Sequence, residues 1–206
     1  MMSTMTCISC NNAVQKGIYN STFYPNLLAM LSAFIVLAII IGALARMSAI
    51  RSRQTVPLFS AAMVLGIGIG GFIDGIVLHQ LLQWHEMLTN KIPADTLVNK
   101  SINMFWDGVF HFFTLITTLV GIYLLWRLSR RTDINKSGYL LSGGLLSGWG
   151  LFNLVEGVIN HQILKLHNVY EYTPTPDVYN YSFLASGVAL LLVGWLLRKI
   201  AKQYSI

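Results

Sequence analysis

The sequence predicts an all-α integral membrane protein with five transmembrane helices. Of its 206 residues, 54% are hydrophobic and only 11% are charged, and the mean hydropathy is +0.59. A soluble domain carries about 25% charged residues. Five long apolar stretches and a one-sided distribution of basic residues lead to the same fold class. No basic region precedes an apolar run at the N-terminus, so we expect no signal peptide.

The five apolar stretches approach the ~20 residues that a helix needs to cross a bilayer. They cover residues 26–44, 57–84, 102–126, 139–166 and 181–197. The five prolines lie at the edges of these stretches or in the connections, which supports the boundaries. We expect residues 1–50 to form an N-terminal segment with the first helix, and residues 51–206 to form a four-helix domain.

The basic residues predict the orientation in the membrane. Ten of the 14 lysines and arginines fall in connections that the five helices place on one side, namely Arg46, Arg51, Arg53, Arg127, Arg130, Arg131, Lys136, Arg198, Lys199 and Lys202. The positive-inside rule makes that side cytoplasmic. The N-terminus is then outside and the C-terminus inside, as expected for a bacterial inner membrane. The same pattern marks topology and excludes a nucleic-acid partner.

One pattern of an acid, a glycine, a His-Gln pair and a final histidine occurs twice with the same spacing. It covers residues 74–85, with Asp74, His79 and His85, and residues 156–167, with Glu156, His161 and His167. Ionisable residues are costly in hydrocarbon, so a membrane helix that carries them indicates a functional site. The predicted topology puts every histidine of the chain on the outer, periplasmic side.

The third apolar stretch adds Asp107 and His111, which lie four apart and so share a helix face. Residues 177–181 repeat this spacing with tyrosine in place of histidine. We therefore expect helices two plus three and four plus five to be related hairpins of a four-helix bundle. Bundle cores are a usual place for metal sites. The first helix is expected to pack outside the bundle.

The spacing of five between acid and histidine predicts an irregular helix in both copies. On an ideal α-helix Asp74 and His79 lie about 140° apart. A π-bulge would bring such positions into phase, and π-bulges are frequent at functional sites. We expect one in each copy.

These residue types predict a metal site. The candidate ligands are His79, His85, His111, His161, His167, Asp74, Asp107 and Glu156. Imidazole and carboxylate suit copper, zinc, iron and manganese. Copper is favoured, and two ions are possible because the donors exceed the needs of one tetrahedral ion. We expect His79, His111 and His161 to converge, with His85 and His167 nearer the surface.

Three further features have alternative interpretations. Trp84 and Trp106 are either aromatic-belt anchors or walls of the site. Cys7 and Cys10 form a disulfide, a second metal site, or neither. The glycines of residues 66–71 look like a nucleotide loop but follow no strand, so close helix packing explains them better.

From residue 71 onward the chain resembles a family of short bacterial membrane proteins, domain of unknown function 2243. The resemblance rests on residues 71–80, Trp84-His85, Asp107-Gly108 with His111, Phe152-Asn153, Glu156-Gly157, His161 and His167. It covers roughly residues 54–206 and implies a four-helix membrane domain with these His and acid positions. The family's association with cytochrome oxidase assembly proteins implies copper. Members often carry a second histidine where this chain has Glu86 and Gln162.

Several functions remain open from the sequence. The first is redox chemistry at a metal site in or beside a membrane oxidase or oxygenase complex. The second is copper delivery for respiratory oxidase assembly. The third is a b-type haem protein with His79 and His161, or His85 and His167, as axial ligands. A proton relay and a structural subunit complete the set. The expected partners are the lipid bilayer and other membrane subunits of a respiratory or oxidising complex.

Overall fold

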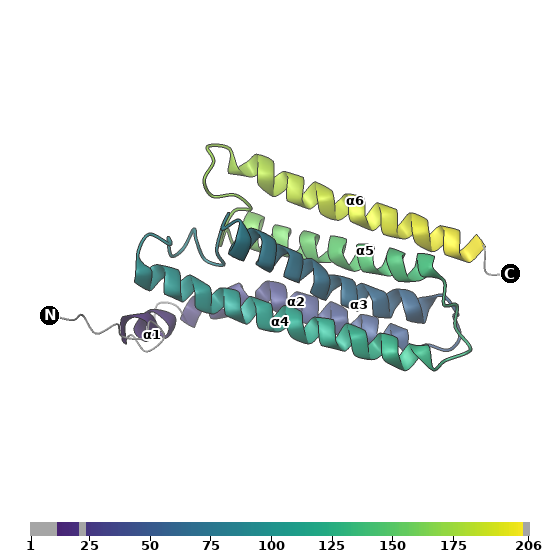
Figure 1. Cartoon of the computed structure of the whole chain (residues 1–206). Coiled ribbons are helices and arrows are strands. Elements are labelled where there is room, and N and C mark those ends of the chain that lie inside the picture. The colour runs from purple at the N-terminus through teal and green to yellow at the C-terminus, as the bar shows by residue number, and fades with distance from the viewer. Residues whose placement is uncertain (1–11, 21–23, 204–206) are drawn as a thin grey trace.

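The computed structural model describes residues 12–20 and 24–203, so Cys7 and Cys10 lie outside the described residues. The described residues form six α-helices and no strand (Figure 1). Two of the helices continue directly into π-helices, labelled η2 and η3. In chain order the elements are α1 (Asn12–Ile18), α2 (Tyr24–Ser48), α3 (Val56–Ile73), η2 (Asp74–Leu81), α4 (Leu97–Ser129), α5 (Gly138–Glu156), η3 (Gly157–Ile163) and α6 (Pro176–Gln203).

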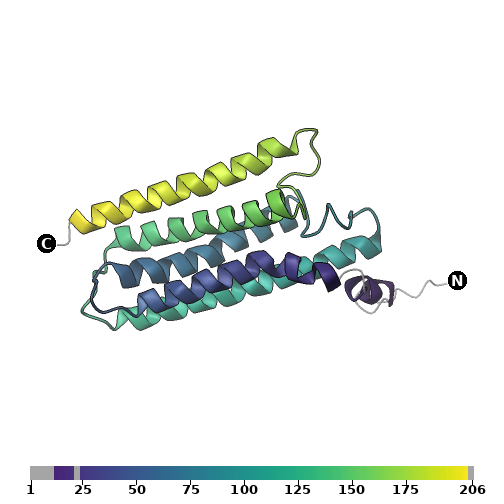
Figure 2. The same ribbon diagram turned by 180° about the vertical axis from the view of Figure 1, so that it is seen from behind.

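The five long helices lie side by side along one common direction (Figures 1 and 2). Contacts run from α4 to α3, from α3 to α5 and from α5 to α6. In both views α4 and α6 occupy opposite edges, so these four helices are arranged as a row. Helix α2 packs against α3, α4 and α5, and its Met30, Phe34 and Leu37 belong to the main hydrophobic core. The first long helix is therefore part of the packed core.

Within the described part of the chain, four helices are long and apolar enough to cross a membrane. They cover Met30–Ser48, Val56–Leu81, Leu97–Ser129 and Pro176–Gln203. They correspond to the first, second, third and fifth predicted stretches, although α4 and α6 run several residues further than predicted. Pro176 is the first residue of α6 and not part of the loop, because proline fits the first turn of a helix. The fourth predicted stretch forms α5 and η3, which are absent from this set because glycine and serine dilute the apolar residues of α5.

Glycines bring α3, α5 and α6 into backbone contact. A Cβ added to Gly66 would collide with the carbonyl oxygen of Leu145, and one added to Gly148 would collide with that of Met63. A Cβ on Gly143 would lie 2.8 Å from the carbonyl oxygen of Gly194 on α6. Small residues allow this kind of close approach between membrane helices. The interpretation of these glycines as packing residues is confirmed.

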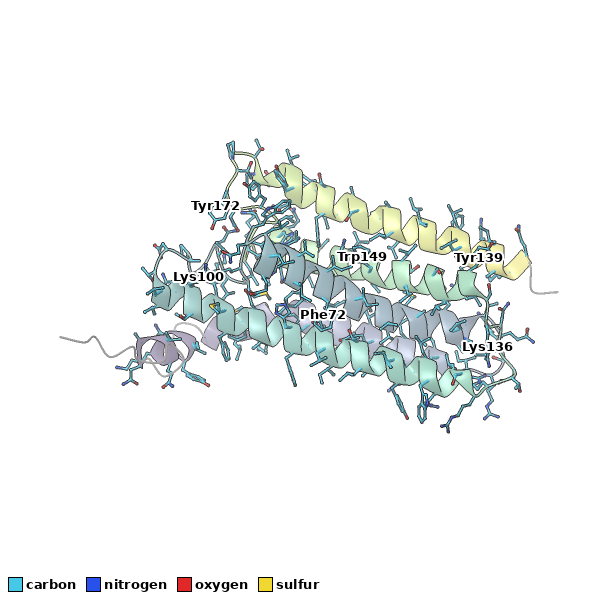
Figure 3. All side chains as sticks on the ribbon, viewed as in Figure 1. Phe72, Lys100, Lys136, Tyr139, Trp149 and Tyr172 are labelled. Atoms are coloured by element: carbon cyan, nitrogen blue, oxygen red, sulfur yellow. The ribbon has the colours of Figure 1, made fainter. Side chains whose placement is uncertain are left out.

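The helices have two chemically different ends. Connections α2–α3 and α4–α5 lie at one end, where Figure 3 labels Lys136 and Tyr139. Arg131 joins the two connections by donating to the carbonyl oxygen of Ile50 (3.2 Å) and to Asp133 (2.6 Å). This guanidinium lowers the pKa of the exposed Asp133 carboxyl to about 2. At the other end, where Figure 3 labels Lys100 and Tyr172, lie the connections that follow η2 and η3.

Candidate metal centre

Both repeats of the sequence pattern form π-helix, as the spacing predicts. The segments are η2 (Asp74–Leu81) and η3 (Gly157–Ile163), eight and seven residues long, which is longer than a single bulge. A π-helix bonds i to i+5, so residues five apart lie one above the other. Nε2 of His79 consequently lies 3.4 Å from Oδ2 of Asp74, and Nε2 of His161 lies 3.1 Å from Oε1 of Glu156.

Each π-helix ends in a turn that folds the chain back over the helix end. Gln83 and Lys165 adopt the left-handed conformation, with φ of 50° and 49°, which is uncommon for residues other than glycine. The amide of Trp84 then donates to the carbonyl of Leu78 (2.9 Å), and that of Leu166 donates to Asn160 (2.8 Å). These turns direct His85 and His167 inward.

Four histidine rings consequently form a compact cluster in the interior. The ring centroids are separated by 4.2 Å from His79 to His85, by 4.5 Å from His85 to His167 and by 4.8 Å from His167 to His161. The two central rings are stacked, with 5° between their planes. All four side chains are buried. The expectation that His85 and His167 lie nearer the surface is wrong, because the turns after the π-helices carry them inward.

Three of these rings are held through Nδ1. The Nδ1 atom lies 2.9 Å from Oδ1 of Asp107 in His79, 2.8 Å from the carbonyl oxygen of Val169 in His85 and 3.0 Å from that of Met87 in His167. Because a carbonyl oxygen only accepts, Nδ1 of the latter two rings is the donor. Their neutral form then carries its lone pair on Nε2. Metal-ligating histidines are usually oriented in this way by a carboxylate or carbonyl on the other nitrogen.

Ligand atoms of the four buried histidines and of Glu156 form two groups among the described residues. Each has ligand atoms within 4.8 Å of one another, and the groups are His79, His85 and His167, and Glu156, His161 and His167. Nε2 of His167 lies 3.1 Å from Oε1 of Glu156, so an acceptor nitrogen faces a carboxylate. Such a contact is favourable only with a proton or a metal cation between them. Ligand atoms bound to one tetrahedral ion at 2.0–2.1 Å lie about 3.3 Å apart, which matches the contacts of 3.1 and 3.4 Å.

The cluster also holds an unusual number of unsatisfied polar atoms. Nε2 of His79 and His85, both ring nitrogens of His161, Oδ1 of Asp74 and Oε2 of Glu156 are buried without a hydrogen bond in the described structure. Most buried polar atoms in proteins have a partner, and exceptions call for a cause such as an ion. Their concentration around four histidines marks a part of the molecule that could hold a cation.

The loop residues that follow η2 have shifted proton affinities. Burial lowers the pKa of the His85 imidazole well below its usual value, and the nearby rings of His79 and His167 act in the same direction. His85 is therefore neutral at pH 7, the form that binds metal. Burial likewise raises the pKa of the neighbouring Glu86, with a further contribution from Asp107.

Asp107 supports the cluster from α4, whereas His111 lies apart from it. Oδ1 of Asp107 accepts from the amide of Met87 (3.0 Å) besides contacting His79. His111 belongs to neither group, because its Nδ1 donates to the carbonyl oxygen of Asp107 (2.7 Å) and its ring faces Gly75 and Phe72. The expected convergence of His79, His111 and His161 is therefore not the arrangement that the structure adopts.

The tryptophans face other aromatic side chains. Trp84 packs against Tyr170 and Tyr179, and Trp106 packs against Phe105. The rings next to the histidines are Phe110, 5.5 Å from His79, and Phe183, 5.4 Å from His161. Sequence reasoning missed both phenylalanines. The signal that could have found them is their equivalent spacing in the two halves: Phe110 lies three residues after Asp107, and Phe183 lies three residues after Asn180.

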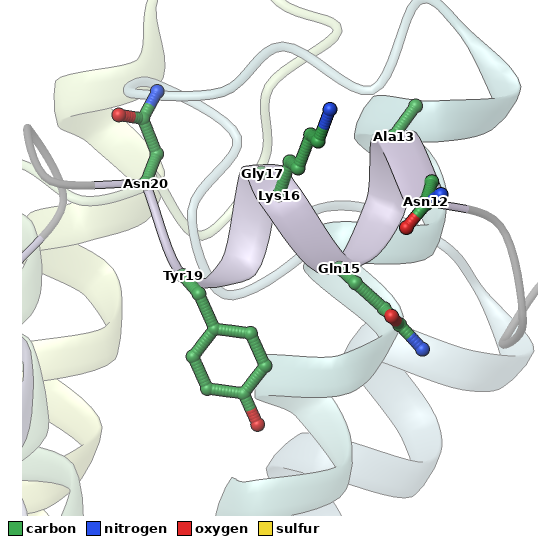
Figure 4. A pocket seen from close by; sticks show the side chains of 7 residues that line it. All are labelled: Asn12, Ala13, Gln15, Lys16, Gly17, Tyr19 and Asn20. Carbon is green, nitrogen blue, oxygen red and sulfur yellow. The ribbon is translucent and has the colours of Figure 1, made fainter.

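A hollow elsewhere in the molecule is unrelated to this cluster. Figure 4 shows it along α1, with a volume of about 710 Å³ and lining residues that all come from residues 12–20. None of its lining residues is among the candidate ligands. Its walls come from one short helix and the residues after it, so it is no alternative to the buried cluster.

The fold and the cluster define an all-helical membrane protein with buried His/carboxylate groups that could hold a metal ion. The family model described as predicted membrane protein (DUF2243) matches residues 61–201, and the chain belongs to this family. The match contains every histidine of the cluster and leaves out α1 and α2. No curated protein and no solved structure matches the chain.

Proposed function

We propose that this chain is a multi-pass membrane protein that binds transition-metal ions, copper in preference, in the His/carboxylate cluster. The metal would serve redox chemistry in or beside a membrane oxidase or oxygenase complex. The observation that carries the proposal is the contact between Nε2 of His167 and Glu156, inside a cluster of buried ligand atoms without hydrogen bonds. A cation placed there satisfies these atoms together.

The donor set supports copper. The two groups offer imidazole and carboxylate, with no thiolate among the described residues. These donors suit copper, zinc and iron, and among the divalent ions Cu²⁺ binds most tightly at a given N/O site. Neither nearby methionine belongs to these groups: Met87 packs in the main hydrophobic core and Met104 is exposed.

The two halves of the chain support a site for two ions. His85 contacts the carbonyl of Val169, and His167 makes the reciprocal contact with Met87. Phe110 stands beside His79 as Phe183 stands beside His161. These parallels fit a pseudo-two-fold relation between α3–η2–α4 and α5–η3–α6. His79 and His85, with Asp74 beside His79, would then form one half-site, and Glu156, His161 and His167 the other, with His167 within reach of both.

The orientation follows from the basic end of the molecule. We propose that α5 with η3 is a fifth span, since it packs between α3 and α6, both long enough to cross a bilayer. With the basic end cytoplasmic, the cluster lies at the periplasmic side of a bacterial inner membrane. An ion would reach it from the periplasm.

The spacing of the rings argues against a b-type haem. His85 and His167 are stacked with 4.5 Å between their ring centroids, which leaves no room for a macrocycle between them. These two rings also pack against His79 and His161, the other pair proposed as axial ligands. A proton relay is the second candidate, favoured by the chain from Asp107 through His79 to Asp74, because acids and histidines in line also carry protons through membranes.

Elemental analysis together with an absorption spectrum tests the proposal. We expect one or two equivalents of copper in detergent-purified protein made with copper present, and loss of that copper in the His79→Ala/His161→Ala variant. The spectrum should lack a Soret band. Folded protein that takes up no transition metal would contradict the proposal and favour the proton relay.

A further inference from the structure

The two half-sites differ at one supporting residue. In the first half, Asp107 on α4 accepts from the amide of Met87 (3.0 Å). In the second half, Asn180 on α6 accepts from the amide of Val169 (2.9 Å). Met87 and Val169 are themselves the residues whose carbonyls receive His167 and His85. Asp107 and Asn180 therefore occupy matching places, with a carboxylate in one half and an amide in the other.

This difference changes how the two outer histidines are held. Oδ1 of Asp107 also contacts Nδ1 of His79 at 2.9 Å, which fixes the ring and leaves Nε2 for an ion. The Asn180 amide nitrogen instead donates to Asn168 (2.9 Å). Nδ1 of His161 is buried without a hydrogen bond, so nothing comparable fixes that ring. A carboxylate on the second nitrogen also makes a histidine a stronger ligand.

The negative charge is divided unequally as well. Asp74 and Asp107 both lie beside His79. Glu156 is the carboxylate that contacts His161 and His167, and it also accepts from Asn160 at 3.3 Å. A divalent cation on Nε2 of His79 therefore lies beside Asp74, while Asp107 contacts the other nitrogen of the same ring. In the second half the cation meets one carboxylate, that of Glu156, which is shared between His161 and His167.

We propose that the centre holds its two metal ions unequally, with a retained ion at His79 and His85, on the side of Asp74, and an exchangeable ion at Glu156, His161 and His167. This inference rests on the proposed metal-binding function. The exchangeable half is then where copper enters, leaves or meets a small ligand. The retained half keeps the cluster ordered while this happens.

A chelator chase of the copper-loaded, detergent-purified protein tests the inference. We expect the wild type to release one equivalent quickly and one slowly. Asp107→Asn keeps the shape of the side chain but removes its charge, so it should speed the slow release about 10- to 100-fold, the usual effect of losing such a partner. Asn180→Asp introduces the missing carboxylate and should slow the fast release. Asp177→Asn is the matched control, because it removes one charge from the exposed start of α6 without touching the cluster.

The outcomes separate this inference from the function on which it rests. Release of both ions at one rate, or a slow phase that Asp107→Asn leaves unchanged, would overturn unequal retention while leaving metal binding intact. A folded wild type that loads only one equivalent would do the same. Failure to bind any metal would overturn both. Circular dichroism of each variant shows whether it is folded, and Asp107→Asn alone decides the question where Asn180→Asp does not fold.

Discussion

Replacing His167 with alanine is expected to remove most of the bound metal. Its Nε2 atom belongs to both groups of ligand atoms and lies 3.1 Å from Glu156. Its loss leaves one group with two histidines and the other with Glu156 and one histidine. We expect the affinity of the remaining site to fall more than 100-fold, beyond the 10- to 100-fold loss that follows removal of a supporting partner. Equilibrium dialysis against copper, with elemental analysis, measures the change.

His111→Ala is the matched control for this prediction. His111 is also a histidine of a membrane helix, but it belongs to neither group and bonds the carbonyl of Asp107 at 2.7 Å. We expect this variant to keep the wild-type stoichiometry and affinity. Equal metal loss in both variants would mean that His111 reaches the ions or that the cluster is not the site.

The second large effect concerns the contact between α3 and α5. Gly148→Ala places a Cβ on the carbonyl oxygen of Met63, and neither helix backbone can move away without separating α3 from α5. Overpacking of a tight core costs about 1–3 kcal/mol and occasionally more. We expect a clash with the backbone of a neighbouring helix to cost an amount at the upper end of this range. A loss of about 3 kcal/mol lowers the melting temperature by roughly 10 °C in a chain of this length. Thermal unfolding followed by size-exclusion chromatography of the detergent-purified protein measures it.

Gly108→Ala provides the comparison on α4. A Cβ at Gly108 meets nothing within 4 Å, so alanine adds no clash there. It also favours the helix by up to about 1 kcal/mol relative to glycine. We expect an unchanged or slightly raised melting temperature. Two variants that melt alike would show that the glycines of α5 are not needed for close packing.

The sequence predicts the helical class and the paired π-helices because both follow from local patterns. Asp74 and His79 lie five apart, and only a wider helix places them on one face. The inward position of His85 and His167 could not be foreseen. It depends on left-handed backbone at Gln83 and Lys165. Glutamine and lysine rarely adopt this conformation, so the sequence does not predict a turn there.

The role of His111 was mispredicted for a related reason. A spacing of four correctly placed it on the face of Asp107, but the histidine bonds the backbone carbonyl of that residue while the carboxylate turns to His79. The repeat of this spacing at residues 177–181 predicts Tyr181 as the counterpart of His111, but Tyr181 is exposed. The residue that joins the network is Asn180, an amide whose hydrogen bonds depend on the tertiary arrangement.

X-ray absorption at the copper edge tests the metal centre most directly, since it reports the atoms bound to the ion. Histidine and carboxylate ligation requires a shell of nitrogen and oxygen at about 2.0 Å, with the outer scattering of imidazole rings and no sulfur at about 2.3 Å. That result is expected for the wild type. A sulfur shell would place the ion at Cys7 and Cys10 instead, and would contradict the assignment of the metal to the histidine cluster.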